Sequence, residues 1–155
     1  AERESFKLNR TVSDWTKNLM GETSLPLCLF GTPKSVEILD GEENDQLRRR
    51  FPFRMTLHPF SWKKEQERQY FRNFLQMVDE KLPLSEPSNL ADPQMAARIY
   101  YATGGLMFEV MRLIRAAGVL ALKRDTPKID LSLLWESFEE NLATNSPHLE
   151  NPFKQ

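Results

Sequence analysis

Two short strand-like segments in the first third of the chain set the strongest constraint on its fold. Residues 25–30 form a continuous apolar run that ends at Gly31, a pattern typical of a strand buried on both faces of a parallel sheet. Residues 53–57 alternate apolar and polar side chains, which predicts a second strand. Two parallel strands alone would expose apolar faces and backbone groups. We therefore expect further strands from outside this chain or from a partner copy.

The rest of the chain carries apolar side chains at helical spacing. Helices are predicted, in chain order, at 8–21, 33–39 and 44–50, and then from Ser61, from Asp92, after Gly105 and from Asp130. The expected fold class is α/β followed by all-α, mostly helical overall. It comprises two parallel strands with helices in 1–59, a helical bundle in 60–143 and a flexible tail in 144–155. The chain opens close to or inside a helix, as a piece of a longer protein would.

Composition removes several classes of protein. The 155 residues include 21 Lys and Arg against 22 Asp and Glu, so the net charge of -1 gives no general argument for nucleic acid or membrane binding. One cysteine and two distant histidines provide neither a disulfide nor metal-ligand spacing, and no metal is expected. Because no apolar run reaches the roughly 20 residues of a membrane-spanning helix, and no leader pattern is present, we expect a cytoplasmic protein without membrane contact.

Three consecutive arginines, Arg48, Arg49 and Arg50, end the second short helix directly before the second strand. A guanidinium group binds phosphate oxygens through a planar fork and keeps its charge, so an arginine here could act as a finger on a nucleotide held by a neighbouring subunit. The simpler interpretation is a solvated basic helix end. Thr32 follows the first strand, where it could orient water or phosphate, although an N-cap role is the more ordinary one.

No glycine-rich phosphate loop of the Walker A pattern is present in the 155 residues, so the chain alone is not expected to hydrolyse ATP. Gly104 and Gly105 fit either an ordinary turn between helices or a close approach to a nucleotide. In the tail, Pro152 and Phe153 have the form of a docking peptide with one aromatic anchor.

The succession of these segments is similar to one known family. Residues 25–32, then 45–51, then Leu82-Pro83-Leu84 with Pro87-Ser88, then Thr103-Gly104-Gly105 and a core helix resemble the TniB/TnsC family of AAA+ transposition regulators. The resemblance covers roughly residues 1–142. It implies that this chain is the last part of an AAA+ core followed by a helical lid, with Walker A and Walker B before Ala1, and that the intact protein binds ATP and Mg²⁺.

The same resemblance implies roles for individual residues. Arg50, with Arg48 and Arg49 as alternates, corresponds to the arginine finger, and Thr32 to the first sensor. Met107 departs from the family, because a second-sensor arginine is common there; Arg112 or Arg115 could replace it. Implied partners are target DNA, a transposase, a target-selector protein and further copies of the chain. The candidates for DNA backbone contact are Lys7, Arg10 and Lys17 on the first helix.

Two alternatives stay open. The chain could be a non-catalytic helical adaptor for protein or DNA, in which the arginine run contacts phosphates. It could also belong to another AAA+ relative, such as a replication initiator or a signalling ATPase, with the same core and lid.

Overall fold

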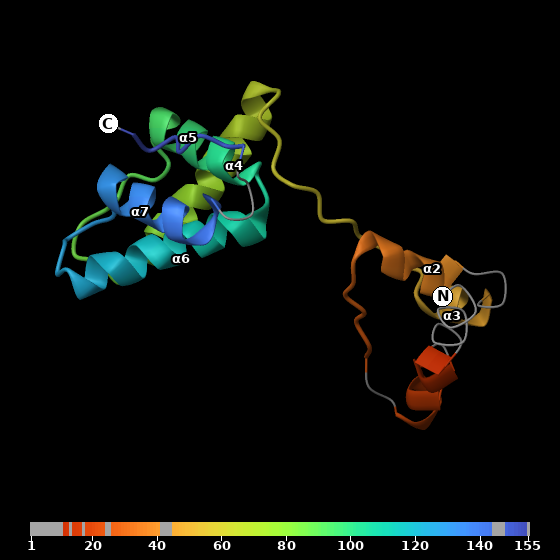
Figure 1. The fold of residues 1–155 in the computed structure, drawn as a ribbon. Coiled ribbons are helices and arrows are strands. Elements are labelled where there is room, and N and C mark those ends of the chain that lie inside the picture. The colour runs from red at the N-terminus through yellow and green to blue at the C-terminus, as the bar shows by residue number, and fades with distance from the viewer. Residues whose placement is uncertain are drawn as a thin grey trace. The chain divides into compact units, whose positions relative to one another are not determined.

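The computed structural model describes residues 11, 12, 14–16, 18–23, 26–40, 45–143 and 148–154 (Figure 1). The chain forms two compact units, Ala1–Thr56 and Leu57–Gln155. The expected boundary was a few residues later, after Pro59. The described residues are mostly helical, as predicted.

The first unit contains short helices. Described residues between 11 and 22 are helical, followed by a 3₁₀ turn η1 (Pro33–Ser35) and by the helices α2 (Val36–Asp40) and α3 (Asp45–Arg50). The two short helices predicted from the sequence are thus confirmed. The carbonyl of Thr32 accepts the N–H of Ser35 at 2.8 Å, which begins η1, and α2 packs against α3.

Neither predicted strand forms in the part of the chain that the structure describes. Residues 26–30 and 53–57 have no regular secondary structure, and the side chains of Phe53, Met55 and Leu57 are 96%, 86% and 81% exposed. A strand is held by the backbone groups of a neighbouring strand, and no described segment offers them. The expectation of two parallel strands is therefore wrong for this structure.

The second unit is a bundle of four described helices, α4 (Glu65–Asp79), α5 (Pro93–Thr103), α6 (Met107–Lys123) and α7 (Leu131–Asn141). Helix α6 packs against α5 and α7, and α5 packs against α4. Their inward faces share one core, formed by Phe71, Leu75, Leu90, Ala96, Ile99, Ala102, Val110, Leu113, Ile114, Ala117, Ala121, Ile129, Leu133, Leu134, Phe138, Leu142 and Phe153.

Local capping residues start two of these helices as predicted. The Asp92 carboxylate accepts the backbone N–H groups of Gln94 and Met95, and the Asp130 carboxylate accepts that of Leu133. The start of α4 differs from the prediction, because its N-cap residue is Lys64 and not Ser61.

Residues 148–154 belong to the segment that the sequence predicts to be flexible, and the structure places them against the second unit. Phe153 is 1% exposed and belongs to the core of the second unit, with its ring against Phe138. Burial of one phenylalanine contributes about 2 kcal/mol toward holding this segment against the core. Among the described helices, none combines the length and hydropathy that crossing a bilayer takes.

Candidate functional site

The arginine run lies at the C-terminal end of α3, as predicted. All three side chains are exposed. Arg48 pairs with Asp45 one turn earlier, with 2.6 Å between its Nη2 and the carboxylate. Arg49 has no ion-pair partner among the described residues. Cations are favourable beside the carbonyl end of a helix, which favours a basic run at this end of α3.

Thr32 is exposed at the end of the first irregular segment, and its backbone carbonyl, not its side chain, is what begins η1. Arg54 comes shortly after the arginine run and pairs with Asp40 at the end of α2 at 2.6 Å. This pair ties the segment after α3 to α2.

The predicted DNA contacts Lys7, Arg10 and Lys17 lie outside the described residues.

Gly104 and Gly105 form the turn between α5 and α6. Gly104 has a φ of 59° and donates its N–H to the carbonyl of Tyr100, which ends α5. Gly105 has a φ of 72°, and a Cβ there would lie 2.4 Å from the carbonyl oxygen of Phe60. The positive φ at both positions, and the close contact at Gly105, therefore explain both glycines without a bound nucleotide. Their role near a cofactor stays a prediction.

The residues considered for a second sensor lie at and after the start of α6. Met107 and Arg115 are exposed. Arg112 is half-buried, pairs with Glu109 at 3.4 Å and donates a second hydrogen bond to the carbonyl of Asn141, the last residue of α7. Arg112 therefore joins α6 to α7, and Arg115 is the more accessible of the two arginines.

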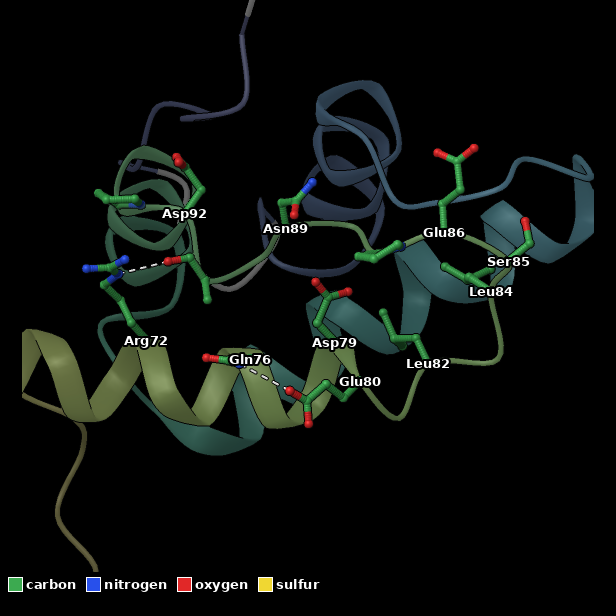
Figure 2. Close-up of a pocket in the computed structure, with 13 residues that line it drawn as sticks. Arg72, Gln76, Asp79, Glu80, Leu82, Leu84, Ser85, Glu86, Asn89 and Asp92 are labelled. Carbon is green, nitrogen blue, oxygen red and sulfur yellow. Dashed lines mark hydrogen bonds between the residues drawn. The ribbon is translucent and has the colours of Figure 1, made fainter.

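An open groove of about 740 Å³ lies beside the second half of α4 (Figure 2). Its other wall is the loop between α4 and α5. Four carboxylates and one guanidinium line it, from Asp79, Glu80, Glu86, Asp92 and Arg72.

Two charged side chains of this groove, Asp79 and Arg72, bind the backbone of the loop that forms its other wall. The two carboxylate oxygens of Asp79 accept the backbone N–H groups of Ser88 and Leu90, at 3.0 and 3.2 Å. Arg72 donates its Nε–H to the carbonyl of Ala91 at 2.8 Å, which Figure 2 shows as a dashed line. Asp79 and Arg72 therefore hold the loop between α4 and α5 against α4 through its backbone.

Glu67, near the start of α4, has a carboxylate that accepts two hydrogen bonds at one oxygen. The Ser61 hydroxyl donates to Glu67 Oε2 at 2.5 Å and the Lys64 N–H donates to the same oxygen at 3.0 Å. These hydrogen bonds lower the pKa of Glu67, and the bond from the Ser61 hydroxyl has the largest effect. Partial burial of the carboxylate opposes them.

In the described ranges no cluster of three His, Cys, Asp or Glu side chains could hold a metal ion.

A second site, which the sequence did not reveal, lies where residues 148–154 pack on α7. There the side-chain amide of Asn151 contacts the carbonyl of Trp135 and the carboxylate of Glu139, and Phe153 fills the core beside them. Phe153 was expected to anchor a partner with Pro152, and in this structure it is buried in its own chain. The Asn-Pro pair is a turn signal that could have predicted the bend, although not its receptor.

No protein-family model matches this chain, and no curated protein matches it.

Proposed function

We propose that this chain is the C-terminal part of an AAA+ transposition regulator, resembling the TniB/TnsC family, that assembles with ATP on target DNA and engages a transposase and a target selector. One observation carries the proposal. A helix that ends in three exposed arginines leads directly into a segment with alternating, exposed apolar side chains, Phe53, Met55 and Leu57. Such a segment has the character of a strand whose sheet lies elsewhere.

The proposed roles follow from the chemistry of the exposed groups. Arg50, or Arg48 or Arg49 in its place, stabilises the negative charge that develops on the γ-phosphate in an adjacent copy. Thr32 holds the attacking water in its own copy through its hydroxyl. ATP and Mg²⁺, bound by a preceding segment, supply the phosphoryl group and its counter-charge. The helical bundle of the second unit is the lid. The cytoplasm is the proposed location.

The experiment uses the protein that contains this chain together with the proposed ATP-binding segment. Arg48→Ala, Arg49→Ala and Arg50→Ala are compared singly and together, with Arg124→Ala as a matched control because Arg124 pairs with Glu136 on the surface of the second unit. Loss of the finger should lower ATP hydrolysis by about 10³-fold and abolish nucleotide-dependent assembly on DNA. Unchanged hydrolysis in the triple variant would show that these arginines are not the finger.

Arg49 is exposed and has no ion-pair partner in the part of the chain that the structure describes, which favours a second candidate function, a phosphate-contact patch of a non-catalytic adaptor. The two functions differ in their response to salt and nucleotide. A patch binds duplex DNA without nucleotide, and its log affinity falls with log salt by about 0.9 for each phosphate contact. Fluorescence anisotropy of a labelled duplex, titrated with this chain at several salt concentrations with and without ATP, separates the two candidates.

A further inference from the structure

The segment that joins the two units in sequence has an unpaired backbone. The N–H of Phe51 donates to the carbonyl of Arg48, and the N–H of Phe60 donates to the carbonyl of Gly105. Among the described residues, the backbone groups of 52–59 form no hydrogen bond, and this stretch has no regular secondary structure. An endoprotease binds its substrate as an extended chain and pairs with its backbone, so this segment fits a protease without unfolding first.

A break in this segment leaves the core of the second unit complete. Among the described residues, that core and the side chains packed against it begin at Phe60 and end at Phe153. The Phe60 ring lies against Phe71 and Phe74, with centroid distances of 5.2 and 5.0 Å. The second unit keeps these contacts when the chain before them is removed, and we therefore expect it to stay folded.

One peptide bond of the segment has the side chain that a trypsin-like protease requires. Arg54 is the only lysine or arginine between Phe51 and Trp62, and it is followed by Met55 rather than by a proline. Trypsin holds a carboxylate in the pocket that receives this guanidinium. The neighbouring side chains of Phe53 and Met55 are almost fully exposed, so further subsites of a protease can receive them.

An ion pair restrains Arg54. Its guanidinium lies 2.6 Å from the carboxylate of Asp40 at the end of α2, and both side chains are partly exposed. A specificity pocket must take the guanidinium from Asp40 before the bond is cut. Because exposed ion pairs are weak, this pair slows the step without preventing it.

We propose that the bond between Arg54 and Met55 is a cleavage site for an endoprotease of trypsin-like specificity, and that cleavage releases the second unit as a folded domain. The reaction consumes one water. The hydroxyl of the water adds to the carbonyl carbon of Arg54, the bond to the Met55 nitrogen breaks, and this nitrogen takes the remaining hydrogen. The site is independent of the proposed ATPase activity, because none of the arginines of α3 takes part in it.

The first experiment treats the folded 155-residue chain with a small amount of trypsin and follows the fragments by mass spectrometry. The first C-terminal fragment to accumulate should begin at Met55, because cleavage within the helices of the second unit requires local unfolding. Arg54→Gln should abolish this fragment. Arg115→Gln, at an exposed arginine within α6, is the control and should leave it unchanged. A first C-terminal fragment that begins at any other residue would overturn the site.

The second experiment asks whether the released unit is folded. The fragment, purified from the digest, should keep a helical circular dichroism spectrum and unfold cooperatively in urea. A fragment without a cooperative transition, or one that trypsin degrades as fast as it forms, would overturn the release of a folded domain.

Asp40→Asn tests the restraint on Arg54. Without its charged partner, Arg54 should be cut up to about fivefold faster. Glu136→Gln, which removes the charged partner of Arg124 in the second unit, is the control and should leave the rate unchanged. Equal rates for the wild-type chain and Asp40→Asn would show that Asp40 does not restrain the site.

Discussion

The backbone N–H of Phe60 donates to the carbonyl oxygen of Gly105 at 2.9 Å, and the carbonyl oxygen of Phe60 lies 2.4 Å from where a Gly105 Cβ would stand. The segment before α4 is thus held directly against the turn between α5 and α6. Phe60 continues the contact through its ring, whose centroid is 5.2 Å from that of Phe71. The close approach depends on a residue without a side chain at position 105.

Gly105→Ala should therefore destabilise the second unit by about 3 kcal/mol, because a positive φ and a clash with backbone act together. Gly118→Ala is the control. Its Cβ would meet Leu82 and Ile129 at ordinary contact distances inside α6, so it should stabilise the chain by about 0.5–1 kcal/mol. Urea unfolding followed by circular dichroism measures both, and similar midpoints for the two variants would contradict this account.

Asp79→Ala should cost about 2 kcal/mol of unfolding free energy, since it leaves the backbone N–H groups of Ser88 and Leu90 without their acceptor. Glu80 lines the same groove, and its carboxylate accepts a hydrogen bond from the exposed Gln76 side chain at 3.1 Å. Glu80→Ala should change stability by less than about 0.5 kcal/mol. Thermal denaturation of the two variants shows whether Asp79→Ala acts through its hydrogen bonds to the loop or through the loss of a negative charge, which Glu80→Ala shares.

Two buried serines should respond in opposite ways to alanine. Ser137 is 0% exposed, and its hydroxyl has no hydrogen-bond partner in the described structure. Ser137→Ala should therefore be neutral or stabilise the chain by up to about 1 kcal/mol. Ser88 Oγ accepts the N–H of Ile129 at 3.0 Å, and Ser88→Ala should cost about 1–3 kcal/mol. A marked loss of stability in Ser137→Ala would reveal a partner for its hydroxyl.

Stability should fall in acid partly through Glu67. Since folding lowers the pKa of this carboxyl, mainly through the Ser61 hydroxyl, its contribution is present above the ordinary glutamate pKa of about 4.3 and is lost as the pH falls through the folded value. Glu67→Gln should reduce the dependence of unfolding on pH between about 6 and 3. Glu65→Gln, at an exposed residue of the same turn, is the control and should leave most of that dependence in place.

Part of the candidate site could be predicted because its causes are local. The helix that carries Arg48 to Arg50, and the turn at Gly104 and Gly105, follow from neighbouring residues alone. The acceptors of Asn151 could not be predicted, since Trp135 and Glu139 approach it only after α7 has packed. The same holds for Asp79, whose partners come from a loop that the sequence shows merely as proline-rich.

By itself the sequence determined which segments are helical and where most of them begin. Asp92 and Asp130 cap helices with their own side chains, and apolar residues every three or four positions mark the buried faces. Only the tertiary structure decided the rest. The alternation at residues 53–57 describes a strand, but a strand exists only when another one pairs with it. The burial of Phe153 depends on the packing of α7 into the core, because a hydrophobic contact requires the surfaces of both partners.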